Sequence, residues 1–216
     1  MLRVGLTGEL GSGKSTVAQM LAQHGAIVLS SDEMGRAMMQ PGHNAFEQIL
    51  ARFGPSILNP DGTLNRSALA KLAFDPQHPR IEELNAIIHP AVLAEQAERV
   101  AELTRTHPHG IVVVESALIF STKHAPGRGW ADRFDCIVLV SAPDDLKIDR
   151  FVQRSASGAA NESTLREQAR RRIEAQRAPL PAGIRVFTVP NAGPLSDLAT
   201  RVSVLWSDLL ELEKSR

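Results

Sequence analysis

Short apolar runs alternate with longer amphipathic segments along this chain. Residues 2–7 carry apolar side chains at every second position, whereas residues 111–114 and 136–140 are nearly continuous runs of Val, Ile and Leu. Alternation with a period of two is typical of a strand, and a continuous β-branched run is typical of a strand that is covered on both faces. We therefore predict five strands, at Leu2–Thr7, Ala26–Ser30, Ile111–Val114, Cys136–Val140 and Arg185–Val189.

Helical patterns lie between these strands, and the alternation predicts an α/β fold with a parallel sheet. The last pattern repeats leucine or valine at spacings of three and four, from Leu195 to Leu212. Such spacing is compatible with a coiled-coil seam or with a single helix that lies on the sheet. We favour the single helix, because the pattern is short for an independent coiled coil.

The interval from Ser31 to Gly110 is much longer than the dozen or so residues that a crossover requires. It contains four stripes of apolar residues at helical spacing, which predict a helical subdomain. Since it follows the carboxyl end of the second strand, we expect it to overhang the edge where such sheets bind ligands. The alternative is a stabilising insertion without ligand contacts. The four stripes lie at residues 46–53, 69–73, 81–88 and 93–104.

Composition narrows the class of protein. The 216 residues include 24 basic and 24 acidic side chains, so no overall charge attracts the chain to nucleic acid or to an anionic membrane. A glycine-rich pattern begins at residue 8, directly after the first predicted strand, and leaves no room for a secretory signal. No apolar stretch is long enough to span a bilayer. The single cysteine, Cys136, lies in an apolar run and is expected in the core. We expect a cytoplasmic enzyme.

The most specific pattern is G-E-L-G-S-G-K-S-T at residues 8–16. It fits the phosphate-binding loop G-x-x-x-x-G-K-[ST], in which glycines allow backbone amides to converge on phosphate oxygens. Lys14 is expected to reach the β- and γ-phosphates, and the Ser15 hydroxyl is expected to bind Mg²⁺. A strand precedes the loop and a helix follows it, which is the context that the motif requires.

Two carboxylates follow predicted strands. Asp32 comes directly after the second strand, where it can orient an acceptor hydroxyl and take its proton, or cap the helix that begins near Glu33. Glu115 follows the third strand, where it can lie near Mg²⁺ or substrate, or act as a solvated loop acid or helix cap. The residues alone leave both choices open.

An arginine-rich segment follows the fourth strand. Arg150 and Arg154 are four residues apart on a predicted helix and share a face. The polar run at residues 155–161 then predicts a hinge or loop, and a basic arm beyond it can close over a triphosphate. A solvated helix with glutamate partners is the alternative, which we favour for Arg170 and Arg171. The Asn191-Ala192-Gly193 tripeptide is either a turn beside adenine or an ordinary turn.

Taken in order, these segments resemble the dephospho-CoA kinase family over about residues 3–210. The helical interval holds the most particular of them. The segments that carry the resemblance are Thr7-Gly8-Glu9-Leu10-Gly11-Ser12-Gly13-Lys14-Ser15-Thr16, Ser31-Asp32, Pro41-Gly42, Phe53-Gly54, Asp61-Gly62-Thr63-Leu64-Asn65-Arg66 with Leu69 and Phe74, Ile88-His89-Pro90, Arg150, Arg154, Arg172-Ile173-Glu174-Ala175-Gln176 and Asn191-Ala192-Gly193.

The resemblance implies a three-layer P-loop kinase fold: a five-stranded parallel sheet with helices on both faces, a helical substrate domain and a lid. It implies transfer of a phosphoryl group from ATP, with Mg²⁺, to the 3′-hydroxyl of dephospho-CoA, the final step of coenzyme A biosynthesis. Within one kinase domain spanning residues 1–216, we assign the core to residues 1–31, 110–150 and 178–216, the helical insert to residues 32–109 and the lid to residues 151–177.

The resemblance also implies roles for individual positions. The residues expected to bind ATP are Gly8, Gly11, Ser12, Gly13, Lys14, Ser15, Thr16, Arg150, Arg172 and Asn191. The residues expected on the substrate side are Asp32, Arg66, His89 and Glu115, with Asp32 facing the ribose 3′-hydroxyl. The catalytic residues are expected to be Lys14, Asp32 and Arg150, and Ser15 is the expected metal ligand.

The chain departs from the family pattern after two strands. Where the family reads D-x-P-L-L-F-E, residues 115–121 read E-S-A-L-I-F-S, and a common D-x-P becomes Ser141-Ala142-Pro143.

Two rival functions stay open. One is another small-molecule P-loop kinase, acting on a nucleotide or a shikimate-like alcohol, and the other is an ATP-binding regulator without turnover. We expect the small molecule dephospho-CoA as a partner, and we expect no binding to nucleic acid or to a membrane. We also expect a monomer or a weak homo-oligomer.

Overall fold

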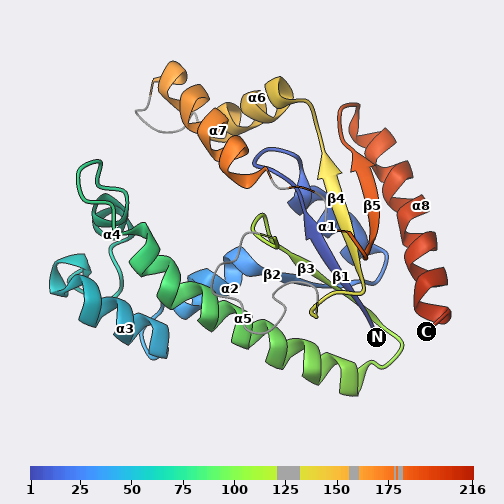
Figure 1. Ribbon diagram of the computed structural model, residues 1–216, viewed down its shortest axis with the longest axis horizontal. Helices are drawn as coiled ribbons and strands as arrows, with labels where there is room; N and C mark the ends of the chain where they lie inside the picture. The colour runs from blue at the N-terminus through green and yellow to red at the C-terminus, as the bar shows by residue number, and fades with distance from the viewer. Residues whose placement is uncertain (121–131, 156–160, 178, 180–181) are drawn as a thin grey trace. The chain divides into compact units, whose positions relative to one another are not determined.

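The computed structural model describes residues 1–120, 132–155, 161–177, 179 and 182–216 (Figure 1). Its strands are β1 (Leu2–Thr7), β2 (Ile27–Ser30), β3 (Ile111–Glu115), β4 (Cys136–Ser141) and β5 (Arg185–Pro190). Its helices are α1 (Lys14–Gln23), α2 (Ser31–Met38), α3 (Asn44–Phe53), the 3₁₀ turn η1 (Pro55–Ile57), α4 (Arg66–Ala73), α5 (Ile81–Thr106), α6 (Asp144–Ser155), α7 (Glu162–Gln176) and α8 (Leu195–Lys214).

The strands form one five-stranded sheet in the order β2-β3-β1-β4-β5, which confirms the predicted doubly wound arrangement. β1 is parallel to both β3 and β4, and β4 is parallel to β5. All five strands lie within one or two residues of the predicted ranges. The order changes direction beside β1, so the loop that follows β1 lies at a crevice of the kind that binds ligands in such sheets.

By its internal contacts the described chain separates into two compact units. Among the described residues, unit 1 comprises residues 1–29 and everything from residue 102 onward. Unit 2 contains Ser30–Ala101. Of all the helices in the described ranges, none is both long and apolar enough to cross a lipid bilayer.

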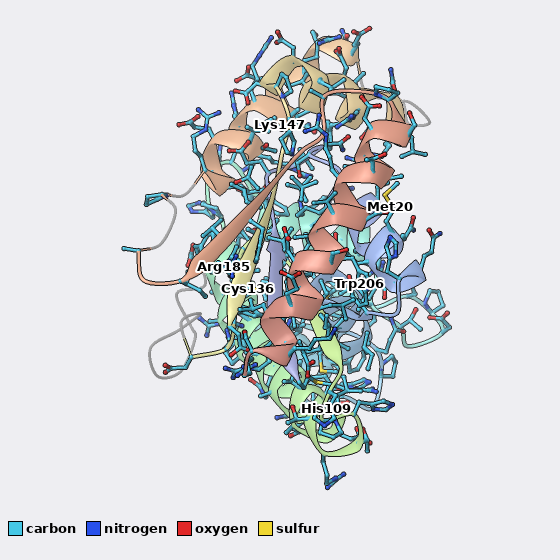
Figure 2. The ribbon with its side chains drawn as sticks, turned by 90° about the vertical axis from the view of Figure 1, so that its right-hand side faces the viewer. Met20, His109, Cys136, Lys147, Arg185 and Trp206 are labelled. Carbon is cyan, nitrogen blue, oxygen red and sulfur yellow. The ribbon has the colours of Figure 1, made fainter. Side chains whose placement is uncertain are left out.

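The core of unit 1 packs α1 and α8 against one face of the sheet. Leu2, Val4 and Leu6 of β1 contribute alternate, fully buried side chains to it. The seam of α8 enters the same core through residues such as Leu205, and Figure 2 shows this helix running across the sheet. The seam is therefore the contact of a single helix with the sheet, as predicted. Cys136 is also buried in this core, and burial raises the pKa of its thiol to about 12.

Unit 2 has a separate apolar core, made by one stripe from each of its helices α3, α4 and α5. Phe46 and Ile49 of α3, Leu69 of α4 and Leu84 of α5 are buried there. The prediction of separate helices at residues 81–88 and 93–104 was wrong, because α5 is continuous through Pro90. Its two apolar stripes belong to successive turns of one helix.

In unit 1, α6 and α7 pack on each other through a small cluster formed by Ile148, Ala169 and Ile173. Leu10, from the loop after β1, packs against the same cluster. The predicted lid therefore begins within a helix that starts before residue 151, and α7 contacts the core directly. Residues 156–160 of the predicted hinge lie outside the described residues.

Candidate active site

The loop between β1 and α1 presents unpartnered backbone donors at the head of a helix. Gly13 is the N-cap of α1, and no side chain caps this end. The first turn contains no acidic residue, and the amides of Ser15 and Thr16 donate to no described residue. Unsatisfied amides together with the positive end of the helix dipole favour an anion at this position.

The shape of the loop depends on Gly13. Its backbone has φ of +97°, and a Cβ at this position would lie 2.2 Å from the side-chain nitrogen of Asn191. Asn191, which is buried, donates that Nδ2 to the carbonyl of Ser12 at 2.8 Å. Asn191 therefore fixes the loop after β5 against the phosphate loop. Of the two sequence interpretations of the Asn191 turn, this contact favours a turn that belongs to the site.

Ser12 has a fully buried hydroxyl that makes no hydrogen bond with any described residue. Gly8 is buried at the end of β1, and a Cβ on it would lie 2.7 Å from that hydroxyl oxygen. Lys14 donates its Nζ to the carbonyl of Glu9 at 3.1 Å, across the loop. The close approach of Gly8 to Ser12 therefore leaves no room for a side chain at position 8.

Ser15 and Glu115 come together at the carboxyl end of the sheet. The exposed Ser15 hydroxyl donates to Oε1 of Glu115 at 2.7 Å. Glu115 is the last residue of β3 and is half-buried, so it neither caps a helix nor lies in the following loop. A hydroxyl and a carboxylate are oxygen donors of the kind that Mg²⁺ prefers. Ser121, which belongs to the same altered family segment, lies outside the described residues.

A pocket of about 350 Å³ adjoins the loop within unit 1. Arg150 and Arg154 both line it, which confirms that they share a face of α6. Arg150 donates to the backbone carbonyl of Asn191 at 3.1 Å and to that of Gly11 at 3.4 Å. Leu195 also lines the pocket, although 64 % of its surface is exposed. The pocket therefore combines backbone, guanidinium and apolar surfaces beside the loop.

Residues of α6 and α7 that the sequence analysis did not assign also contact the loop. Lys147 of α6 is 2 % exposed and forms ion pairs with Glu9 of the loop and, at 2.7 Å, with Asp144. The hydrogen bond from Lys147 lowers the pKa of the Asp144 carboxyl. Gln176 accepts a hydrogen bond from the Leu10 amide at 2.7 Å. An acid at Glu9, in a loop otherwise built for anions, was the signal that a cation must lie nearby.

Arg172 is exposed on α7, with its guanidinium carbon 5.7 Å from the centroid of the Phe151 ring. It makes no hydrogen bond with any described residue. Arg171 pairs with Glu167 at 2.9 Å on the same helix. The solvated-helix interpretation therefore holds for Arg171, and the guanidinium of Arg172 keeps its hydrogen-bonding capacity.

In unit 2, Asp32 lies in the first turn of α2. Of its two sequence interpretations, the one that made Asp32 the helix cap was wrong. Ser30 is the N-cap and accepts a hydrogen bond from the Glu33 amide at 3.3 Å. The neighbouring Ser31 hydroxyl accepts from Nε2 of the buried Gln96 at 2.8 Å, which fixes α2 to α5. The Asp32 carboxylate itself is exposed and has no hydrogen bond or ion pair with any described residue.

Arg66 and His89 also belong to unit 2. Arg66 is the exposed first residue of α4, and Asn65 caps this helix through a 3.0 Å bond from the Ala68 amide. Asp61 shapes the preceding turn by accepting from the amide and the hydroxyl of Thr63, which lowers the pKa of its carboxyl. The D-G-T-L-N-R segment therefore builds the turn that presents Arg66. His89 is half-buried on α5, and no hydrogen bond joins Asp32 to Arg66.

Comparison with known proteins adds a second line of evidence. The dephospho-CoA kinase family model matches residues 2–180, which extend through the loop, unit 2 and α7. The chain belongs to the dephospho-CoA kinase family. It is 37 % identical over 210 residues to the dephospho-CoA kinase of Moorella thermoacetica, covering 97 % of this chain and 92 % of that one. It is 34 % identical over 217 residues to that of Thermobifida fusca, with complete coverage of both chains.

Solved structures agree with this membership. The structure of TT1252 from Thermus thermophilus matches with a TM-score of 0.68 and 30 % identity, covering 96 % of this chain and 97 % of that one. A dephospho-CoA kinase from Campylobacter jejuni matches with a TM-score of 0.59 and 96 % coverage of both chains. Its identity of 16 % limits that second likeness to the fold. The predicted P-loop kinase fold is confirmed.

Proposed function

We propose that the protein transfers the γ-phosphoryl group of ATP to the 3′-hydroxyl of dephospho-CoA, which gives CoA and ADP in the final step of CoA biosynthesis. Membership of the dephospho-CoA kinase family across residues 2–180 is the observation that supports this reaction most directly. The free amides at the head of α1 and the adjoining pocket of about 350 Å³ supply features that the ATP end of the reaction requires.

Charge on the transferring group is stabilised by the loop and by α6. Phosphoryl transfer needs little covalent help, so catalysis depends on position and on electrostatic stabilisation. In this proposal the Ser15 and Thr16 amides hold phosphate oxygens, and Lys14 turns from the Glu9 carbonyl to the β- and γ-phosphates. Arg150 lies beside the loop carbonyl of Gly11, where its charge faces the same phosphates. Exposed Arg172 supplies a further cation from the lid.

Mg²⁺ fits the oxygen pair at Ser15 and Glu115, whose side chains are 2.7 Å apart. We propose that the Ser15 hydroxyl binds the ion and that Glu115 orients that hydroxyl or binds the ion through water. When bound, Mg²⁺ neutralises phosphate charge. The Glu115 carboxylate then holds a position at the end of β3 that the family pattern gives to another acid.

The acceptor side is assigned to unit 2. We propose that the Asp32 carboxylate, exposed and without a partner among the described residues, accepts the proton of the 3′-hydroxyl and orients its oxygen for attack. Arg66, exposed at the head of α4, is suited to an anionic group of the substrate, and His89 belongs to the same side. The division into core, helical insert and lid stays a proposal of the same kind.

An assay of ADP release distinguishes this function from its rivals. Purified protein is incubated with ATP and Mg²⁺, and dephospho-CoA, AMP and shikimate are added in separate reactions. Of the three acceptors, we expect only dephospho-CoA to give rapid ADP release. Faster release with AMP or shikimate would indicate another small-molecule kinase, and ATP binding without acceptor-dependent release would indicate a regulator. A cytoplasmic location and a monomer or weak homo-oligomer are further proposals, which fractionation and sedimentation would test.

A further inference from the structure

Glu9 places a negative charge in the loop that is expected to bind a triphosphate. It is the one acid among residues 8–16. Its carbonyl accepts both the Ser12 amide at 3.1 Å and the Lys14 ammonium at 3.1 Å, so Glu9 lies within the folded loop. Like charges a few ångströms apart oppose one another, and more strongly where water is partly excluded. An uncompensated carboxylate here would weaken the binding of an anion.

Lys147 supplies the compensating charge from the adjacent helix. Its side chain is buried, and its ammonium pairs with Glu9 and with Asp144. Arg177 completes the cluster, at 3.5 Å from Glu9 and 2.9 Å from Asp144. Glu9 and Asp144 thus each pair with both Lys147 and Arg177. Removal of Lys147 would leave a net negative charge beside the loop, because Arg177 is half-exposed and also pairs with Glu174 at 3.4 Å.

The backbone around Glu9 is held against α6 and α7. A Cβ on Gly11 would lie 2.3 Å from the Lys147 carbonyl oxygen, so loop and helix are in direct contact there. The amide of Leu10, which lies between Glu9 and Gly11 in the loop, donates to the side chain of Gln176. The backbone of three consecutive loop residues is therefore held against α6 and α7, and Arg177 at 3.5 Å still pairs with the Glu9 carboxylate when Lys147 is replaced.

We propose that Lys147 is a positioning residue for ATP: its buried ammonium neutralises Glu9 and so preserves the affinity of the loop for phosphate. The inference depends on the proposed function only in taking ATP as the ligand of the loop. Lys147 does not touch the phosphates in this account. It acts through Glu9, and the chain thereby tolerates an acid inside an anion site.

Two substitutions separate neutralisation from a merely structural role. In Lys147→Met a similar volume replaces the ammonium, and the remaining Glu9 charge should weaken binding of Mg·ATP about tenfold. In Glu9→Gln the repulsive charge is gone, so Mg·ATP should bind at least as tightly as to the unsubstituted protein. A pair that only holds the loop in shape would instead weaken binding in both variants.

The experiment is calorimetric titration of the full chain with Mg·ATP, with melting temperature recorded for every variant. We expect Glu9→Gln combined with Lys147→Met to recover most of the affinity that Lys147→Met loses. Arg171→Met and Glu167→Gln change the same charges in an exposed pair on α7 and should leave the affinity within about twofold of the unsubstituted protein.

The outcomes are distinguishable. Binding to Lys147→Met within about twofold of the unsubstituted protein, or no recovery in the double variant, would overturn the inference. If Lys147→Met does not fold, Glu9→Gln decides alone, because weaker ATP binding in that variant contradicts neutralisation and unchanged or tighter binding supports it. Failure of the unsubstituted protein to bind Mg·ATP would instead overturn the proposed function.

Discussion

The two units of the molecule use their charged residues in different ways. In unit 1, Glu9, Lys147 and Arg150 are held by specific partners in or beside the phosphate loop. In unit 2, Asp32 and Arg66 are exposed and have no ion pair among the described residues. In the proposed mechanism the fold therefore preorganises the nucleotide side, whereas the proposed acceptor residues keep their hydrogen-bonding capacity. Substitution of Lys147 or Arg150 should therefore affect stability, whereas substitution of Asp32 or Arg66 should affect turnover alone.

The largest expected effect comes from Asp32. Asp32→Asn keeps the shape of the side chain but removes the base, so we expect kcat to fall roughly 10²–10⁴-fold. The affinity for ATP and the melting temperature should not change, because the carboxylate has no partner to lose. Glu33→Gln, a neighbouring exposed acid on α2, is the matched control. Near-normal turnover of Asp32→Asn would remove Asp32 from the mechanism.

The next effect concerns the metal. Glu115→Gln weakens the acceptor of the Ser15 hydroxyl, and changes to such outer partners typically reduce metal affinity roughly 10–100-fold. The Mg²⁺ concentration that gives half-maximal rate should rise accordingly, with a smaller change in rate at saturating Mg²⁺. Glu211→Gln on α8 serves as the control. An unchanged Mg²⁺ requirement would show that Glu115 does not contribute to binding of the ion.

Stability of the loop region gives a smaller, sharper test. Gly13 and Gly42 both have positive φ, but only Gly13 would bring a Cβ against another residue, Asn191. Both alanine variants should lose about 1 kcal/mol from the backbone conformation. Gly13→Ala should lose about 1 kcal/mol more, since displaced Asn191 no longer donates to Ser12. Equal losses in urea unfolding would show that the Asn191 contact does not stabilise the fold.

The smallest effect tests the ion pairs of unit 2. A hydrogen bond from Arg80, with help from Arg52, lowers the pKa of Glu83 from 4.5 to about 2. A carboxyl with a lowered pKa stabilises the fold fully above its ordinary pKa, and this contribution disappears as the pH falls through about 2. The difference in unfolding free energy between the protein and Glu83→Gln should therefore be larger at pH 7 than near pH 2. A difference that does not change with pH would contradict this.

The sequence was sufficient where a local pattern dictates the structure. The strands, the loop at residues 8–16 and the seam of α8 follow from period and composition. The continuity of α5 through Pro90 did not follow, because proline usually interrupts a helix and tertiary packing decided otherwise. Lys147 was missed because its role depends on a residue far away in the chain, Glu9. Periodicity reports burial of a face, and it does not report which partner lies opposite.

The same distinction applies to the site. The loop at residues 8–16 was predictable as a structural element because its glycines dictate the backbone geometry. Asp32 had two interpretations until the structure gave the helix cap to Ser30. The contact of Glu115 with Ser15 could not be read from the sequence, because it depends on the register in which β1 pairs with β3. Residues that act through side-chain contacts between distant elements need the folded chain to be recognised.

Identification of the product tests the central claim most directly. Purified protein, ATP carrying an isotopic label in the γ-phosphoryl group, Mg²⁺ and dephospho-CoA are incubated together, and the products are analysed by mass and fragmentation. The account predicts CoA that carries the label on the ribose 3′-oxygen, with one ADP formed for each CoA. Unmodified dephospho-CoA despite bound ATP, or a label at any other position, would contradict it.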